Sequence, residues 1–517
     1  TEEKENLADL GFETSTFETL ALDFQQANQP PPLLTLLSAM ATTPLTLPPK
    51  WYPPHEVLAP RVASPFKEPR VIESLSGNLN TTLDLGWVQF HAPGQSFITR
   101  ALNRSIPANA PERPDSSHLH FHGLHGSSVL PGDDVTLPVG PRGEFTYLIR
   151  IPPDHMPGTF WVHPHVHGSS TLQIGAGAAA TLLIQDPPGY LPATVEAARD
   201  LVWMIQFFAS TLQWNIARAS GDETFAIFGE EEQNNGGEAT RIRDLWLVNG
   251  LHSPVLRAAP GEWMRWRLIY SGLRDIPGLA LDLTLEGRIS AACEKQLLAK
   301  DGIYLTDFPR LIDTARVPAG GRADVMVRCS LPGQVDVMAA DSPLATLIID
   351  GGVVNSSNMQ DWTPERPAYL QDLMGAMPKC SCLTWFGACH DPMLLGERCV
   401  NGRSFSASTH MHLSVLGDVQ ERRVSGIRSH PYHQHMHPFQ LISGFTDTPY
   451  FKQGDWHDTW QDNTLAANEV VTLRFRPLTY SGRMMVHCHW NQHQDAGMMA
   501  SEGIFAVPFN GSSCAFH

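Results

Sequence analysis

Histidines gather in four short segments, and these segments hold the residues best suited to chemistry. The chain has 23 histidines, and more than half of them lie in HLHFHG, WVHPHVHG, HPYHQHMHPF and VHCHWNQHQDAGM. Two segments come early in the chain and two come late. On a β-strand, residues i and i+2 project from the same face, so each H-x-H pair presents two imidazoles to one metal-sized space. Each pair is half of a metal site, and four of them indicate metal binding.

The last segment carries the sharpest signal. Cys488 lies between His487 and His489, with His493 five residues after the thiol and Met498 five residues further on. A thiolate, imidazoles and a distant thioether are the ligand set of a blue copper electron-transfer site. If the thiol points to one side of its strand, the flanking histidines must point to the other, so this tripeptide would join two metal centres. The alternative, a buried free cysteine with unrelated histidines nearby, does not explain the spacings.

The four segments, in this order, resemble the copper motifs of the multicopper oxidases, the group that includes laccases, ferroxidases and bacterial cuprous oxidases. The motif H-x-H-G is present at residues 120–123 and W-x-H-x-H at residues 161–165. The motif H-P-x-H-x-H is present at residues 430–435, and H-C-H-x-x-x-H-x-x-x-x-M at residues 487–498. All four copper motifs of the family are therefore matched.

The resemblance implies four copper ions in two sites. A type 1 copper would be bound by His430, Cys488 and His493, with Met498 as the axial ligand. The other three ions would form a trinuclear site that binds dioxygen. In that site, a type 2 copper would lie between His120 and His433, and a type 3 pair would be bound by His122, His163 and His489 on one ion and by His165, His435 and His487 on the other.

Three further histidines leave an alternative register open. His118, His167 and His437 lie in step with the H-x-H pairs, so a two-residue slip of the ligand assignment is conceivable. The glycine after His122, the tryptophan before His163 and the His-Pro that opens the third motif favour the assignment above.

Reduction of dioxygen to water consumes protons, so acidic groups are expected near the trinuclear site. Asp133 or Asp134 follows the first motif at about the place where the resemblance puts an acidic residue, and Asp495 follows His493. Each of the three could equally be an ordinary turn residue. Gln494 stands where some bacterial relatives carry glutamate and cannot supply a titrating proton, which puts weight on Asp495.

The implied activity is one-electron oxidation of reducing substrates at the type 1 copper, coupled to reduction of dioxygen to water. Phenols and aromatic amines are favoured, because the loose cluster of Met374, Met377 and Met393 falls short of the Met-rich insert of a dedicated cuprous oxidase. One alternative is a metallo-oxidase that acts on cuprous or ferrous ion. A copper electron-transfer or binding protein without oxidase activity is less favoured, because it needs fewer histidines.

Short strands must position these motifs. From about Val62 onward, β-branched and aromatic runs such as FTYLIRIPP, EWMRWRLIYSG and GRADVMVRC alternate with turn signals. The resemblance implies an all-β chain of three consecutive cupredoxin-like Greek-key β-sandwich domains, with the trinuclear site between the first and third. Pro- and Gly-rich breaks place these domains at residues 61–190, 191–355 and 356–517, after an N-terminal extension of residues 1–60.

The composition excludes several classes of partner. Charged residues make up 17% of the chain, and Gly and Pro number 41 each, which favours turns and short strands over long helices. The net charge of -17 argues against a nucleic-acid or anionic-membrane partner. No apolar run approaches the length of about 18 residues needed to span a bilayer. We expect a soluble monomer whose partners are a small-molecule or metal-ion reductant and dioxygen.

Cysteines and glycosylation sequons predict a secreted, extracellular or periplasmic protein. Besides Cys488 the chain has seven cysteines, which cannot all pair. The tight group from Cys380 to Cys399 is typical of a disulfide-stapled loop in an oxidising compartment, although its spacing also admits metal binding. Sequons begin at Asn80, Asn103, Asn355 and Asn510.

Overall fold

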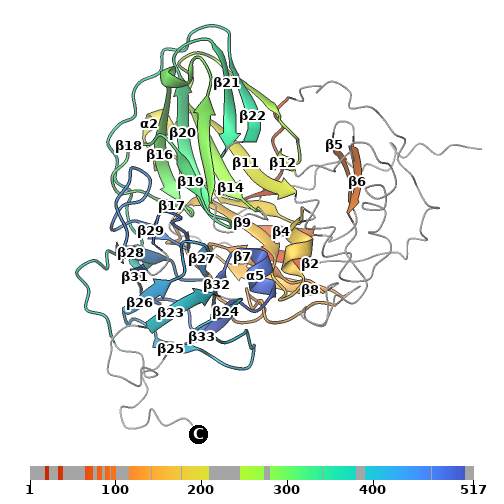
Figure 1. Cartoon of the computed structure of the whole chain (residues 1–517), viewed down its shortest axis with the longest axis vertical. Helices are drawn as coiled ribbons and strands as arrows, with labels where there is room; N and C mark the ends of the chain where they lie inside the picture. The colour runs from red at the N-terminus through yellow and green to blue at the C-terminus, as the bar shows by residue number, and fades with distance from the viewer. Residues whose placement is uncertain are drawn as a thin grey trace, which may run out of the picture.

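The computed structural model describes most of the chain that follows residue 115. It covers residues 116–208, 245–379 and 391–506, with gaps at 141–142, 176, 273–279, 341, 397 and 467–468. Before residue 100 it describes residues 65–69 and six strand segments. The described chain folds mainly into three successive pairs of β-sheets (Figure 1).

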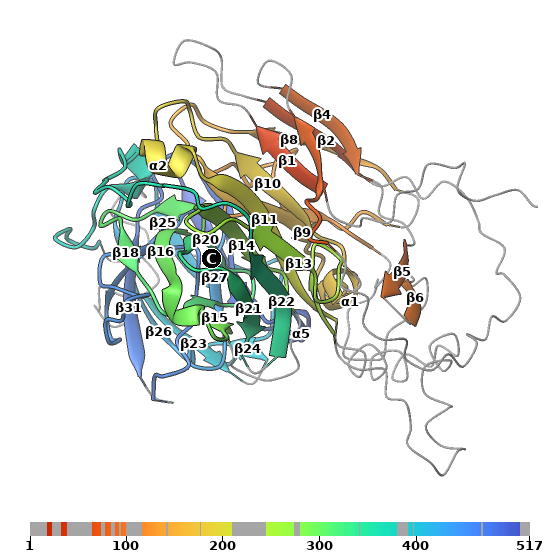
Figure 2. The ribbon, with the colours of Figure 1, turned by 90° about the horizontal axis from the view of Figure 1, so that it is seen from above.

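The first pair of sheets draws strands from both sides of the first histidine motif. Its larger sheet has the order β3 (Arg70–Glu73), β1 (Glu18–Leu22), β10 (Ala180–Ile184), β9 (Gly158–Pro164) and β7 (Leu119–His122). Its smaller sheet has the order β4 (Asn78–Leu83), β2 (Leu33–Ser38) and β8 (Phe145–Arg150). Two strands of the segment expected as an N-terminal extension thus pair within these sheets, while β5 (Val88–Ala92) and β6 (Gln95–Thr99) form a separate hairpin (Figure 2).

The second pair of sheets comes from the middle of the chain. Its larger sheet has the order β12 (Leu245–Val248), β11 (Arg199–Phe208), β14 (Met264–Tyr270), β20 (Arg322–Cys329), β16 (Cys293–Lys300) and β17 (Ile303–Tyr304), with β18 (Arg310–Leu311) on β16. Its smaller sheet has the order β13 (Val255–Ala258), β22 (Ser342–Ile349), β21 (Gly333–Ala339), β15 (Leu281–Glu286) and β19 (Ala315–Val317). A disulfide joins Cys293 on β16 to Cys329, its register partner on β20.

The third pair of sheets carries the last two histidine motifs. One sheet has the order β24 (Cys399–Val400), β23 (Asp391–Gly396), β26 (Gln420–Ser425), β31 (Val470–Phe475), β28 (Phe439–Ser443) and β29 (Trp456–His457). The other has the order β25 (His412–Val415), β33 (Met499–Phe505), β32 (Gly482–Cys488), β27 (Tyr432–Gln434) and β30 (Thr459–Trp460). Cys399 has no disulfide partner among the residues the structure describes, and the predicted stapled loop otherwise lies outside them.

Alternation of apolar side chains builds the cores between the sheets. Strand β14 is buried along its whole length: Trp266 packs at a ring-centroid distance of 4.5 Å from Trp203 in the apolar core, while Arg265 and Arg267 both reach the buried carboxylate of Asp324. Each large apolar side chain contributes roughly 1.5–3 kcal/mol when fully buried. The predicted all-β class is confirmed, whereas the predicted domain boundaries stay a prediction.

Helices are few and short in the described ranges. They include α1 (Ser170–Gly175), α2 (Ala193–Glu196) and α5 (Asn491–Asp495), and α1 and α5 follow histidine motifs. None of the helices described is long and apolar enough to cross a bilayer.

Candidate metal centre

Two pairs of antiparallel strands bring the four histidine segments together. On β7 and β9, His120 is the register partner of His163, and on β27 and β32, His433 is the register partner of His487. The first strand pair belongs to the first pair of sheets and the second to the third, so the motifs meet where these sheets face each other (Figure 1). Backbone hydrogen bonds of each ladder therefore set the spacing of the imidazoles.

Three buried histidines from different segments converge on one point. The Nε2 atom of His487 lies 3.1 Å from Nε2 of His165 and 3.2 Å from Nε2 of His435. All three side chains are buried, and their ring nitrogens lie close enough together to hold one metal ion. The sequence grouped these histidines around one copper, and the structure brings them together.

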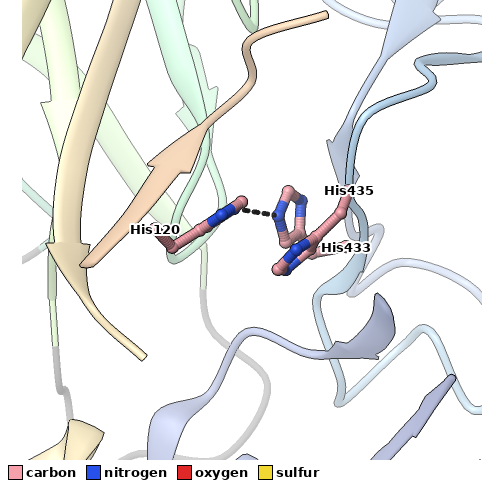
Figure 3. Close-up of side chains that lie close together, drawn as sticks. All are labelled: His120, His433 and His435. Carbon is pink, nitrogen blue, oxygen red and sulfur yellow. Dashed lines mark hydrogen bonds between the residues drawn. The ribbon is translucent and has the colours of Figure 1, made fainter. Parts of the chain in front are cut away.

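Two further groups lie beside this one. The Nδ1 atom of His122 is 3.3 Å from Nε2 of His163, and the ring of His489 is 4.9 Å and 5.3 Å from the rings of those two histidines. The Nε2 atoms of His120 and His433 lie 3.4 Å apart, which Figure 3 shows together with the stacked ring of His435. Both groups match the sets expected from the sequence.

The hydrogen bonds of these rings leave bare nitrogen atoms facing one another. A neutral imidazole carries one N–H. Nδ1 of His487 donates to the carbonyl of Cys488 at 3.0 Å, and Nδ1 of His163 donates to that of Pro164 at 3.0 Å. Burial lowers the pKa of His163 to about 3 and that of His487 to about 4, so both rings are neutral. Their Nε2 atoms therefore present lone pairs to the cluster.

His120 and His433, drawn in Figure 3, also present bare nitrogen atoms. Nδ1 of His120 is 2.8 Å from Oδ2 of Asp133, and Nδ1 of His433 is 2.9 Å from the carbonyl of Asp458, so both Nε2 atoms are bare. Nε2 of His489 is also buried and has no hydrogen-bond partner in the described part of the chain. Lone pairs that converge in a buried space repel each other unless a cation lies between them, so this donor set fits copper ions.

A separate site surrounds the single thiol. Nδ1 of His430 lies 3.0 Å from Nδ1 of His493, and Sγ of Cys488 lies 3.7 Å and 3.8 Å from these two nitrogens. The thiol is buried, while both histidines are partly exposed. Met498 is buried, and its carbonyl accepts the N–H of Cys488 at 3.1 Å, which places its backbone beside the thiol. One sulfur and two imidazoles suit a soft, redox-active metal.

The predicted alternation along the tripeptide is confirmed. Cys488 faces His430 and His493, whereas the flanking residues His487 and His489 face the imidazoles of the larger cluster. The two candidate metal sites are thus joined through one continuous stretch of covalent bonds.

The three predicted acids lie in different surroundings. Asp133 contacts His120, and burial raises the pKa of Asp133 to about 8. Asp134 instead accepts hydrogen bonds from the backbone and hydroxyl of Thr136, as a turn residue does. Asp495 accepts backbone N–H groups of Gly168 and Thr171 near the start of α1, both at 2.7 Å, and burial raises its pKa to about 6. Of the three, the structure brings Asp133 to the histidine cluster.

The extra histidines lie outside the cluster. Nδ1 of His118 is 3.0 Å from the carbonyl of Leu119, and its ring packs against Tyr147. His437 bonds the carbonyl of Tyr480 at 3.1 Å, and the ring of His167 packs against Phe405. These positions speak against the two-residue slip.

Sequence reasoning missed an acid at the cluster, Asp458. Its Oδ1 lies 3.2 Å from Nε2 of His122, and its carboxylate also accepts hydrogen bonds from Thr459 and from Arg322 of the middle sheets. Burial raises the pKa of Asp458 to about 6, and the guanidinium of Arg322 opposes this rise. No local motif marks Asp458, because its contact with His122 joins residues 336 positions apart.

Comparison with known proteins adds independent evidence. A model of the multicopper oxidase family matches residues 379–502. The multicopper oxidase MmcO of Mycobacterium tuberculosis is 26% identical over 413 residues, which cover 74% of this chain and 76% of that protein. The multicopper oxidase mco of Staphylococcus haemolyticus is 23% identical over 394 residues, with the same coverage of 74% and 76%.

Solved structures share the fold. A multi-copper oxidase from Pediococcus acidilactici superposes with a TM-score of 0.55 at 21% identity, covering 78% of both chains. A multicopper oxidase from Campylobacter jejuni, described as a metallo-oxidase, superposes with a TM-score of 0.56 at 18% identity, covering 81% of this chain and 90% of that one. The sandwiches described above are therefore cupredoxin-like. Four histidine segments converge on two candidate metal sites, and the chain is similar in sequence and in fold to multicopper oxidases, oxidoreductases that use oxygen.

Proposed function

We propose that the protein removes electrons one at a time from phenols or aromatic amines at a type 1 copper site and reduces dioxygen to water at a trinuclear copper site. The observation that carries this proposal is the Cys488 tripeptide, whose thiol lies in one donor set and whose flanking histidines lie in the other. When bound, copper would supply one-electron redox chemistry, because each ion cycles between Cu⁺ and Cu²⁺.

The proposed ligands follow from the bare donor atoms. His430, Cys488 and His493, together with Met498, would hold the type 1 copper. Nε2 atoms of His120 and His433 would hold the type 2 copper. The type 3 pair would be held by His122, His163 and His489 and by His165, His435 and His487. His122 would bind through Nδ1, because its Nε2 faces Asp458 and Thr459.

The chain itself would provide the entry and the path for electrons. His430 and His493 are the partly exposed members of the thiol site, so a substrate docks against them. The ring of Trp490 packs at a centroid distance of 4.1 Å from His493 and excludes water from its inner side. The covalent bonds from Cys488 to its neighbours then connect the two sites without a change of structure.

Four substrate molecules would each give up one electron, and dioxygen, four electrons and four protons would yield two molecules of water. Asp133 is the proposed proton-holding group, because Oδ2 lies against Nδ1 of His120 and the side chain is mostly buried. The positions of Asp134 and Asp495 give less support to the same role, since their described bonds go to Thr136 and to the backbone near α1.

Electrostatics near the thiol site support organic donors over metal ions. Burial lowers the pKa of His493 to about 4, and the neighbouring charges of His430 and Arg398 act in the same direction. Within the described ranges, no carboxylate acts on His430 or His493 in the same way. Ferrous ion prefers carboxylate and imidazole ligands, and cuprous ion prefers thioethers. The positive charge of Arg398 therefore disfavours a cation more than a neutral or anionic phenol.

The metal-ion alternative rests on the likeness to the Campylobacter jejuni metallo-oxidase. The predicted methionine cluster gives it little support. Met393 is buried in the core, whereas Met377 is 87% exposed, so these two side chains do not share one surface. We keep cuprous or ferrous oxidation as the second candidate.

Oxygen uptake tests the proposal. The copper-loaded protein is mixed in turn with a phenol, an aromatic amine, ferrous ion and cuprous ion, and the Cys488→Ser variant serves as the control. The proposal expects uptake with the organic donors, at a ratio of four donors oxidised per dioxygen, and none in the variant. Faster uptake with a metal ion would favour the second candidate, and uptake by the variant would refute the proposed path.

A further inference from the structure

The middle pair of sheets contains none of the copper motifs, yet one of its side chains reaches the histidine cluster. Arg322 begins β20, is completely buried and forms a two-pronged ion pair with Asp458 of the third pair of sheets. Its two terminal nitrogens lie 2.7 Å from Oδ1 and 2.6 Å from Oδ2 of this aspartate. Such a planar pair fixes the orientation of the carboxylate as well as its charge.

The carboxylate held by Arg322 in turn contacts the cluster. Oδ1 of Asp458 lies 3.2 Å from Nε2 of His122 and accepts the hydroxyl of Thr459 at 2.8 Å. The same hydroxyl oxygen lies 3.1 Å from Nε2 of His122 and 3.0 Å from Nδ1 of His433. The hydrogen bonds of Nε2 of His122 and Nδ1 of His433 therefore depend on the position of this carboxylate.

Asp301, which follows β16, holds the same segment from the other side. Its Oδ2 accepts the backbone N–H groups of Asp458 and Thr459, both at 3.3 Å, and contacts Nδ1 of His457 at 3.0 Å. Its Oδ1 accepts the backbone N–H of Arg322 at 2.9 Å, and its carbonyl accepts the Arg322 guanidinium at 2.9 Å. Two residues of the middle sheets thus clamp the backbone and the side chain of Asp458.

We propose that Arg322 is a positioning residue for the trinuclear site and acts through Asp458. This inference rests on the proposed function, because it assumes that the cluster binds copper. By orienting Oδ1, Arg322 makes Asp458 accept the N–H at Nε2 of His122, which leaves Nδ1 of that histidine bare toward His163. The middle sandwich is then part of the oxygen-reducing site rather than a spacer between two copper-binding sandwiches.

A matched pair of variants tests this proposal. Arg322→Gln removes the guanidinium beside Asp458. Arg310→Gln is the control, because Arg310 also comes from the middle sheets and also pairs with both oxygens of a buried aspartate, Asp455, each at 2.8 Å. Asp455 lies only three positions before Asp458, but its carboxylate bonds Lys300, Arg310 and the backbone N–H of Lys452 rather than a cluster histidine.

The readouts are copper bound per folded chain, the type 1 blue absorption and the type 2 electron paramagnetic resonance signal. Loss of a group that orients a metal ligand typically weakens metal binding by about 10- to 100-fold. We expect Arg322→Gln to bind the trinuclear copper ions more weakly by this factor and to keep its blue absorption. Arg310→Gln should keep both its trinuclear copper and its blue absorption. If the two variants retain equal trinuclear copper, the proposal is overturned. A wild-type protein that binds no copper would instead refute the proposed function.

Two further variants keep the test decisive. If Arg322→Gln does not fold, Arg322→Lys retains the charge but cannot form the two-pronged pair, and it should still lose trinuclear copper selectively. If the Arg322→Lys variant binds copper as tightly as the wild type, the proposal is overturned. Adding Asp458→Asn makes a double-mutant cycle, in which Arg322→Gln should have little further effect on copper affinity. Additive losses would show that Arg322 does not act through Asp458.

Discussion

Replacement of Gly320 by alanine should displace a cluster histidine. Gly320 lies between β19 and β20 with a φ of +84°, and a Cβ atom there would lie 2.5 Å from Cγ and Cδ2 of His489. Carbon atoms normally pack at about 3.5–4.0 Å, so the ring must move by about 1 Å. The backbone cannot easily move away, because two hydrogen bonds hold it. The N–H of Gly320 donates to the carbonyl of Tyr270 at 2.8 Å, and the carbonyl of Gly320 accepts the indole N–H of Trp161 at 3.2 Å.

A displacement of about 1 Å in a reacting group can cost about 100-fold in rate. Alanine in the left-handed region also costs about 1–2 kcal/mol of stability, whatever its neighbours. Gly417→Ala is a control for this strain, because Gly417 has a φ of +86° and nothing lies within 4 Å of its would-be Cβ. The two variants should therefore lose similar stability, apart from the clash at His489.

Rapid mixing of the reduced protein with oxygen measures the expected loss. Gly320→Ala should be re-oxidised about 100-fold more slowly than Gly417→Ala, while the type 1 blue absorption stays equal in both. Equal re-oxidation rates would refute the assignment of His489 to the oxygen-reducing site. Loss of the blue absorption in Gly320→Ala would show that the displaced His489 also disturbs the thiol site, which would contradict the separation of that site from the histidine cluster.

Three other substitutions give simple outcomes. Cys488→Ser should abolish the blue absorption and substrate oxidation with an unchanged circular dichroism spectrum, and continued oxidation would contradict the thiol site. Met498→Leu should raise the type 1 reduction potential in a redox titration, because loss of the axial thioether destabilises the oxidised ion more, and a lowered potential would count against Met498 as a ligand. Asp133→Asn should slow oxygen reduction per bound copper by about 100-fold; Asp134→Asn, whose described side-chain bonds go to Thr136 rather than to a cluster histidine, is its control, and equal rates in both would exclude the proton role.

The direction of the side chains within each motif could be predicted because strand geometry is local, whereas the ligand sets are what the family resemblance implies. Alternation along a strand places His120 beside His122 on one face. It also directs the side chain of Cys488 to the face opposite His487 and His489. The way in which segments from opposite ends of the chain meet came from the family resemblance and not from spacing. The structure brings the same groups together.

The supporting groups could not be predicted in this way. Arg322 and Asp458 lie 136 positions apart, and neither stands in a motif, so only the packing of the sheets brings them together. The sequence puts weight on Asp495, because it follows His493 and because Gln494 cannot supply a titrating proton, yet the carboxylate of Asp495 accepts backbone N–H groups near α1. His493 and Asp495 both lie on α5, where side chains two positions apart do not face each other, so closeness in sequence does not bring this acid to the ligand's partners.

Copper analysis of the reconstituted protein tests the central claim most directly. We expect about four copper ions per chain, one of them blue and dependent on Cys488, with the remaining ions in the histidine cluster. A colourless protein that binds one copper ion or none under the same conditions would contradict it.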